Sequence, residues 1–162
     1  MLLDDLDRRL IAALADSPRA GVLELSRKLG AARNTIQSRL DKLMTSGVIA
    51  GFGPEVELAA IGYHVAAYVT LQIAQGRGSN VTSHLASIPQ VLEVHRTTGD
   101  GDLLCRVVAL SNVHLAEVLD RILEVQGIDR TTSSLVLDTP VPARVFPAIE
   151  ALAPAVETLD KS

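Results

Sequence analysis

The chain has 162 residues, and its 15 Lys or Arg against 19 Asp or Glu give a formal net charge of -4 at pH 7, which excludes a uniformly basic, histone-like protein. Apolar residues make up 48% and charged residues 21%, so the composition predicts a globular protein of one or two domains rather than a disordered chain. With two Phe, two Tyr and no Trp, the chain has few side chains on which bases could stack, which disfavours a reader of single-stranded RNA.

The sequence favours a reducing, cytoplasmic location. The only cysteine, Cys105, cannot form a disulfide within the chain. A membrane-spanning helix would require a run of about 18 uncharged apolar residues, and the sequence has none. The first residues include Asp4 and Asp5, whereas a signal peptide starts with basic residues and an apolar stretch. We therefore expect no membrane partner.

Basic residues are concentrated near the N-terminus. Residues 1–50 contain eight Lys or Arg and six Asp or Glu, a net charge of +2, whereas residues 51–162 carry a net charge of -6. Between Arg19 and Lys42 there are six basic residues against two acidic ones. Such a patch suits a polyanion, because phosphate contacts supply most of the sequence-independent energy of DNA binding. A solvated charged surface would show the same excess.

The first 50 residues predict three helices. Asp4 or Asp5 can cap the first helix, and the second spans about residues 22–29 before Gly30, which can adopt the left-handed conformation that ends a helix. The third spans about residues 32–46. In each helix, apolar residues recur at spacings of three or four and form one buried stripe, made of Leu6, Leu10, Ile11 and Leu14, then Val22, Leu25 and Leu29, then Ile36, Leu40 and Leu43.

The outward face of the third helix is polar. A tight turn around Gly30 joins it to the second helix, as in helix-turn-helix proteins that place their second helix in the major groove. Amide side chains can pair with adenine, and arginine with guanine. The candidate DNA-contacting residues are Arg33, Asn34, Thr35, Gln37, Ser38, Arg39 and Lys42. The alternative is a plain three-helix bundle whose polar face contacts only water.

From residue 64 onward the pattern is that of alternating strands and helices. The predicted order is a strand at 64–74, a helix around 81–88, strands at 91–98 and 103–110, a helix from 113 to Gly127, and a strand at 128–139. This β-α-β, turn, β-α-β order predicts a sandwich in which both helices cover one face of an antiparallel sheet. The fold class is α+β: an N-terminal winged helix-turn-helix domain plus a C-terminal ferredoxin-like βαββαβ sandwich.

The other face of the predicted sheet has no covering layer. The strand at 103–110 carries apolar residues on both sides, with Leu104 and Val108 opposite Leu103 and Cys105. An uncovered apolar face needs a partner. We therefore expect self-association through the sheet.

The turn Thr98-Gly99-Asp100-Gly101-Asp102 has two interpretations. Glycine and aspartate are the residues that a hairpin turn demands. In the functional interpretation, backbone N–H groups beside the glycines hold a carboxylate and Asp100 or Asp102 pairs with an ammonium group, so the loop binds both ends of an amino acid. Two carboxylates fall short of the oxygen shell of Mg²⁺ or Ca²⁺, and the histidines and lone cysteine form no zinc signature. We expect no metal, no cofactor and no catalytic site.

Together these motifs resemble the Lrp/AsnC family, the feast/famine regulators, over roughly residues 3–140. They are LDDLDRRLIAAL at the start, LSRKLG and NTIQSRLDKL in the helix-turn-helix, GVIAGF after it and TTGDGDLLCRV in the second domain. The resemblance implies a transcription regulator that binds double-stranded DNA and an amino-acid or related small-molecule effector, with dimers that assemble into octamers or similar. It places the helix from Arg33 to Arg39 on DNA and the turn at 98–102 at the effector.

Four segments are expected: a helix-turn-helix domain at 1–50, a wing or hinge at 51–63, a ferredoxin-like effector-binding and oligomerisation domain at 64–141, and a tail at 142–162. The tail carries apolar residues at helical spacing, namely Ile149, Leu152, Val156 and Leu159. It is either a helix that packs on a neighbouring subunit or a frayed terminus.

Two rival functions stay open on the sequence alone. One is a metabolite sensor whose helical head contacts protein rather than DNA. The other is an enzyme that uses Asp100 or Asp102 with His95. Neither rival predicts a salt-sensitive, sequence-specific shift of duplex DNA, so this measurement separates them from a regulator.

Overall fold

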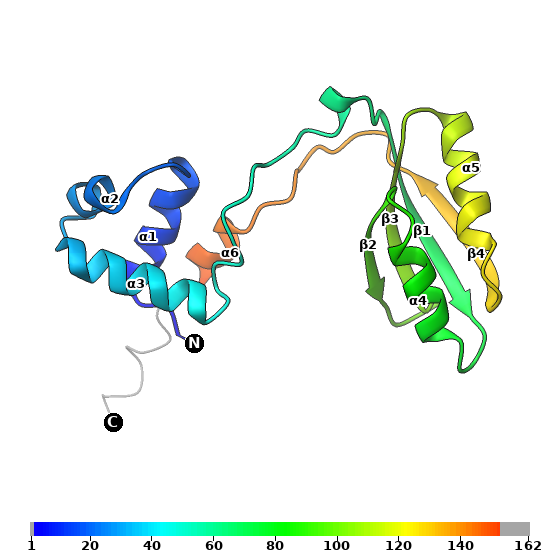
Figure 1. Cartoon of the computed structure of the whole chain (residues 1–162), viewed down its shortest axis with the longest axis horizontal. Coiled ribbons are helices and arrows are strands. Elements are labelled where there is room, and N and C mark those ends of the chain that lie inside the picture. Colours follow the sequence, from blue (N-terminus) through cyan, green and yellow to red (C-terminus); the bar gives the residue numbers. More distant parts are fainter. Residues whose placement is uncertain (1, 153–162) are drawn as a thin grey trace. The chain divides into compact units, whose positions relative to one another are not determined.

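The computed structural model describes residues 2–152 (Figure 1). The chain forms two compact units. The first contains the chain up to Pro54 together with the segment that starts at Pro142, and is called the head below. The second runs Glu55–Val141 and is called the sheet domain. Among the described residues, no helix is long and apolar enough to cross a membrane.

The described part of the head consists of α1 (Asp5–Asp16), α2 (Val22–Leu29), α3 (Arg33–Thr45) and the short α6 (Phe146–Ala151). The apolar stripes predicted from the sequence meet in one core. Its fully buried members include Leu10, Leu25, Ile36 and Leu43. Burying one such aliphatic side chain contributes about 1.5–3 kcal/mol, so this core is what holds the helices together. The three predicted N-terminal helices are confirmed.

The helix ends in the head follow their local chemistry. The Asp7 N–H donates to the Asp4 carboxylate at 2.9 Å, and the Asp4 N–H donates to the Asp7 carboxylate at 3.3 Å, which forms a capping box at the start of α1. Gly30 ends α2 with φ 67°, in the left-handed region that glycine adopts without strain. At the start of α3, Ala32 makes no side-chain capping bond.

The sheet domain contains a 3-10 turn, η1 (Ala59–Ile61), followed by β1 (Val65–Ile73), α4 (Gly78–Ala86), β2 (Val91–Arg96), β3 (Leu103–Ala109), α5 (Asn112–Leu123) and β4 (Ile128–Leu135). The strands pair antiparallel in the order β2-β3-β1-β4. Both α4 and α5 cover the same face of this sheet (Figure 1). The predicted α+β fold is confirmed. The last strand ends at Leu135, opposite Ala67 of β1, and not at residue 139 as expected.

The two faces of the sheet differ in polarity. Ala67, Val69 and Leu71 of β1 are fully buried under the helices. The alternate positions of β1 and their partners on β4 are polar on the open face, namely Tyr68, Thr70, Gln72, Arg130, Thr132 and Ser134. The expected apolar open face is present only in part, because Leu104 and Val108 of β3 and Ala66 of β1 lie on it but Arg106 separates the two β3 residues. Self-association through this face stays a prediction.

The segment that leaves the head forms no wing. Residues 50–57 contain neither helix nor strand in the described structure. Ile49 is the last residue anchored to the head, where its N–H donates to the Leu43 carbonyl at 3.0 Å and its side chain packs on the core. Gly51, Gly53 and Pro54 follow, and proline has no N–H to donate to a hairpin partner. The described residues thus show no hairpin there, and a hinge at this segment stays a prediction.

The C-terminal segment packs on the head of its own chain. Phe146 and Ile149 lie one turn apart on α6 and are partly buried against the head core. The Arg8 Nη1 donates to the Leu152 carbonyl at 3.1 Å. The described part of the tail is therefore helical and held by α1 rather than frayed. Val156 and Leu159, which were predicted to continue the helix, lie outside the described residues.

Candidate DNA-binding surface and effector site

The outward face of α3 carries the polar side chains that the sequence predicts there. Ile36 and Leu43 are fully buried, which fixes the rotation of the helix about its own axis. The side chains turned away from the core are exposed, namely Arg33, Asn34, Thr35, Gln37, Ser38 and Lys42. Gln37 donates from Nε2 to the Asp41 carboxylate at 2.8 Å, a bond within the exposed face that a base edge can replace.

Arg39 has a different environment from the other predicted DNA-contacting residues. Its Nη1 donates to the Asp7 carboxylate at 2.9 Å and also to the Asp4 carboxylate. These two bonds raise the pKa of Arg39 above its usual value, and the Arg39 guanidinium lowers the pKa of Asp4. Asp7 is buried, so its carboxylate needs this partner. The structure thus gives Arg39 a role in fastening α3 to the start of α1, which the sequence analysis missed.

The predicted effector turn is packed tightly against β1. A Cβ atom added to Gly101 would lie 2.1 Å from the Thr70 Cγ2, so glycine is required for this close approach. The Asp102 carboxylate accepts a hydrogen bond from the Ile73 N–H at 2.6 Å, and the Asp102 N–H donates to the Leu71 carbonyl at 2.8 Å. The Asp102 side chain therefore holds the turn on the sheet through one of its two carboxylate oxygens.

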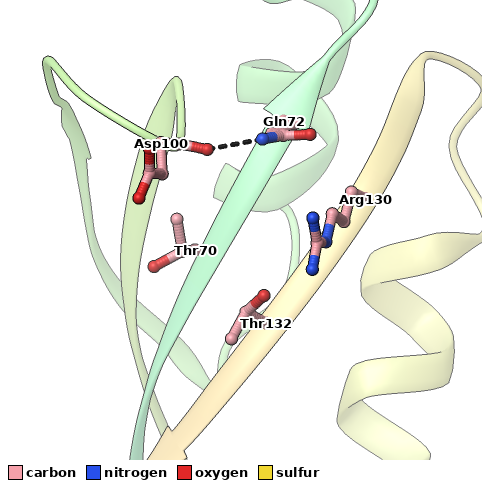
Figure 2. Close-up of a pocket in the computed structure, with 5 residues that line it drawn as sticks. All are labelled: Thr70, Gln72, Asp100, Arg130 and Thr132. Atoms are coloured by element: carbon pink, nitrogen blue, oxygen red, sulfur yellow. Dashed lines mark hydrogen bonds between the residues drawn. The ribbon is translucent and has the colours of Figure 1, made fainter.

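The other aspartate of the turn lines a depression of about 350 Å³ on the open face of the sheet (Figure 2). Its lining residues are Thr70, Gln72, Asp100, Arg130 and Thr132. The β1–β4 register places Thr132 opposite Thr70 and Arg130 opposite Gln72. The Gln72 Nε2 donates to the Asp100 carbonyl at 2.6 Å, which joins the turn to the strand that forms the floor.

The charges of this depression have no partners within residues 2–152. No hydrogen bond or ion pair there engages the guanidinium of Arg130 or the carboxylate of Asp100, both of which are exposed. Elsewhere on the open face, by contrast, the Glu93 carboxylate accepts from the Arg106 Nη1 at 3.1 Å. Hydrogen bonds from His95 and Arg106 lower the pKa of Glu93. A cation and an anion left free in one depression are complementary to a zwitterion.

The sequence pointed to part of this site only. It singled out Asp100, but not Arg130, Thr132, Thr70 or Gln72. The alternation along β1 marks the face that carries Thr70 and Gln72, but β4 is polar at every position from Asp129 to Ser134, so its pattern does not single out Arg130 or Thr132. Thr98 and Gly99 are exposed in the turn but do not line the depression, and Gly101 is buried beneath it.

A second depression, of about 340 Å³, lies beside the start of α4. It is lined in part by Gly78, Arg96, Thr97 and Asp102. One oxygen of the Asp102 carboxylate accepts from the Ile73 N–H, whereas the Asp100 carboxylate accepts no hydrogen bond from the described residues. The depression beside Arg130 is therefore the stronger candidate for an effector site.

The remaining predicted centres are also located. Cys105 is buried on the helix-covered face, and burial raises the pKa of its thiol to about 11. It therefore packs in the core as a small apolar residue would. Within residues 2–152 there is no cluster of three or more His, Cys, Asp or Glu side chains that could hold a metal ion.

Comparisons with known proteins agree with this geometry. Residues 3–44 match the AsnC-type helix-turn-helix domain and residues 66–146 match the Lrp/AsnC ligand binding domain. An HTH-type transcriptional regulator of Pyrococcus horikoshii is 34% identical over 137 residues, which cover 85% of this chain and 91% of that protein.

Solved structures give the same result. The structure of Escherichia coli AsnC superposes with a TM-score of 0.85 at 27% identity, covering 91% of this chain and 100% of that one. A feast or famine regulatory protein from Mycobacterium tuberculosis, solved in complex with L-methionine, superposes with a TM-score of 0.77 at 27% identity, covering 87% and 96% of the two chains.

Fold and site together define a two-domain protein that joins a helix-turn-helix head to a ferredoxin-like ligand-binding domain. The extent of the matches then identifies its relatives. The chain belongs to the Lrp/AsnC family of helix-turn-helix transcriptional regulators.

Proposed function

We propose that this protein is a cytoplasmic transcription regulator that binds specific duplex DNA through α3 and responds to an α-amino acid bound in the depression beside Arg130. The proposal of an amino-acid effector rests on one observation: the guanidinium of Arg130 and the carboxylate of Asp100, both without partners among the described residues, line the same depression. The DNA part is supported by the exposed polar face of α3 and by the local excess of basic residues.

On DNA, the six exposed α3 residues make the contacts. Asn34 and Gln37 can pair with adenine and Arg33 with guanine, while Thr35, Ser38 and Lys42 hold the backbone. Because Ala32 supplies no side-chain cap, the first N–H groups of α3 are free to donate to a phosphate. Arg39 does not contact DNA in this proposal but orients α3 relative to α1 through Asp4 and Asp7.

In the effector site, Arg130 binds the carboxylate of the amino acid and Asp100 binds its ammonium group. Thr70, Thr132 and Gln72 offer hydroxyl and amide groups around them. This assignment changes the prediction from the turn in two ways. Asp100 and not Asp102 binds the ammonium group, because Asp102 already accepts a hydrogen bond from β1. Arg130, and not the backbone N–H groups of the turn, binds the carboxylate. The L-methionine complex of the Mycobacterium tuberculosis relative supports an amino acid as the ligand class.

Two heads are needed to bind two half-sites, which lie about 34 Å apart for one turn of DNA. We propose that the sheet domains supply this pairing through their open faces, and that dimers assemble further, up to an octamer. Sedimentation velocity at micromolar concentration tests the assembly, and a monomer under these conditions would contradict it.

The DNA part is tested by mobility shift with a duplex that the protein selects from a randomised pool. The double variant Asn34→Ala, Gln37→Ala should bind this duplex at least about tenfold more weakly, because each bidentate base contact contributes about 1–3 kcal/mol. The matched control is Asn80→Ala, Gln126→Ala, which removes the same groups from exposed positions of the sheet domain. Equal losses in both double variants would refute the assignment of α3.

The effector part is tested by thermal shift against the twenty amino acids. A ligand that binds only the folded protein raises the melting temperature in proportion to its saturation. At least one amino acid should do so in the wild type, and no shift with any of them would refute this ligand class. A protein that binds an amino acid but shifts no DNA would instead be a metabolite sensor.

A further inference from the structure

The two units are connected twice along the chain. Residues 46–64 lead from α3 to β1, and residues 136–145 lead from β4 back to α6 in the head. A fully extended segment of ten residues spans at most about 35 Å, so the returning connection is a short tether rather than a long linker. A head attached at both ends has less freedom than one attached through a single hinge.

The returning connection is anchored only at its two ends. At the sheet end, the Val136 N–H donates to the Ala66 carbonyl at 2.9 Å. Between the ends, Leu137, Val141 and Val145 are 95%, 61% and 66% exposed, so their apolar side chains fix the segment to nothing described. The next residue, Phe146, is partly buried in the head core. α6 is therefore the point at which the returning chain is fastened.

At the head end, the fastening acts on the helix that orients α3. Phe146 and Ile149 pack on the core that α1 shares with α3, and the Leu152 carbonyl accepts from Arg8 of α1. The same helix α1 holds Arg39 of α3 through the carboxylate of Asp7. Contacts thus run without a gap from α6 through α1 to the DNA-contacting helix.

At the other end, the tether begins in the strand that lines the effector depression. Arg130 and Thr132 lie on β4, and the chain passes from Leu135 directly into the returning connection. A ligand that pulls on Arg130 acts on the strand to which the tether is covalently joined. The first connection also leads into a lining strand, since β1 carries Thr70 and Gln72, but it is longer and enters through the 3-10 turn η1.

We propose that α6 is the coupling element of this regulator: docked on α1, it transmits the state of β4 to the DNA-contacting helix, and released from α1 it leaves the two units independent. The proposal rests on the proposed function, since it needs the head to bind DNA. It makes Phe146 and Ile149 positioning residues, which touch neither DNA nor effector.

The test uses the full-length chain and amide hydrogen exchange, with a duplex selected by the wild-type protein as the probe. Coupling is reciprocal, so DNA bound to the head must alter the sheet domain if α6 links them. In the wild type, adding the duplex should change the exchange rates of β4 amides by at least about fivefold, which corresponds to a coupling free energy of roughly 1 kcal/mol. The variant Phe146→Ala, Ile149→Ala should lose this response in β4 and keep the protection of α3 by DNA. Val141→Ala, Val145→Ala is the matched control and should behave as the wild type.

A second variant separates the tether from the fold of the head. Twelve Gly and Ser residues inserted between Val141 and Pro142 leave every described contact of α6 in place but slacken the connection, since such linkers are flexible coils. This insertion should abolish the β4 response while α1 keeps its wild-type exchange. A purely structural role of α6 predicts no effect of the insertion.

An unchanged β4 response in the insertion variant, or no response in the wild type, overturns the proposal. A wild type that shifts no DNA removes the proposed function and the coupling with it. If DNA is bound but no amino acid is, only the effector assignment fails and the exchange measurement still decides. Where an amino acid is found, its effect on DNA affinity should fall to nearly none in both variants, while its own affinity stays within about twofold.

Discussion

Charged side chains serve opposite purposes in the head and in the sheet domain. In the head, Arg39 of α3 is bonded to Asp4 and to the buried Asp7, so its charge is used within the fold. In the sheet domain, Arg130 and Asp100 share a depression and neither has a partner within residues 2–152. A charge with satisfied partners positions an element of the fold, whereas an oppositely charged pair without partners in a depression is available to a ligand.

The largest effect should come from breaking the satisfied set in the head. Asp7→Ala removes a buried carboxylate that accepts from Arg39 and from the Asp4 N–H, and hydrogen bonds to charged groups are each worth about 1.5–3 kcal/mol. We expect the free energy of unfolding of the head to fall by about 2 kcal/mol in urea denaturation followed by circular dichroism. Asp5→Ala, at an exposed position of the same helix, should change it by less than about 0.5 kcal/mol. Equal losses in the two variants would show that the hydrogen bonds of Asp7 with Arg39 and Asp4 do not stabilise the head.

The complementary change in the sheet domain should affect binding and spare stability. Arg130→Gln removes the proposed partner of the effector carboxylate and should weaken amino-acid binding at least about tenfold, as the loss of one charge-assisted bond does. Titration calorimetry measures this loss, and the melting temperature without ligand should stay close to that of the wild type. Arg121→Gln, on the exposed side of α5, provides the control. A loss of stability in Arg130→Gln with wild-type affinity would mean that Arg130, like Arg39, serves the fold and not a ligand.

A smaller effect is expected where the turn meets the floor of the depression. In Gly101→Ala, the new Cβ forces the Thr70 side chain to move, because the two would otherwise lie 2.1 Å apart. Since Thr70 can rotate, we expect a loss of about 1 kcal/mol in stability together with weaker effector binding. Gly53→Ala meets nothing within 4 Å and serves as the control. Unchanged stability and affinity would mean that the turn is looser than its packing indicates.

The smallest effect concerns the acid side of the pH profile. The pKa of Asp4 is lowered from its ordinary value of 3.8, chiefly by the hydrogen bond from Arg39. A lowered pKa in the folded state contributes stability that is present above pH 3.8 and is lost as the pH falls below it through the folded-state pKa. The wild type should therefore exceed Asp4→Asn in stability at pH 6, and the difference should shrink at pH 3. A difference that grows on acidification would contradict this sign.

Local signals predicted the elements and their ends. The stripes of Leu and Ile in the first three helices, the stop at Gly30 and the alternation of β1 depend on near neighbours in sequence, and all are present in the structure. The capping pair of Asp4 and Asp7 is also local. It could have been recognised from its spacing of three residues, which is that of a capping box.

Contacts between distant residues could not be predicted in this way. Arg39 lies 32 residues from Asp7, and the sequence alone placed it at the border of the apolar stripe of α3, among the predicted DNA-contacting residues. Arg130 reaches the depression only because the β1–β4 register sets it opposite Gln72. The apolar spacing of the tail left open a helix on a neighbouring subunit or a frayed terminus, and it did not indicate the head of the same chain, since any apolar patch satisfies the same pattern.

The burial of Cys105 gives each unit a separate stability readout. Its thiol is the only one in the chain, and burial under the helices of the sheet domain raises its pKa to about 11. A thiol reagent at neutral pH can therefore modify the protein only when this domain opens, because the reactive species is the thiolate. The kinetics of thiol labelling therefore report the opening of the sheet domain alone. A loss of circular dichroism that occurs before labelling reports the unfolding of the head.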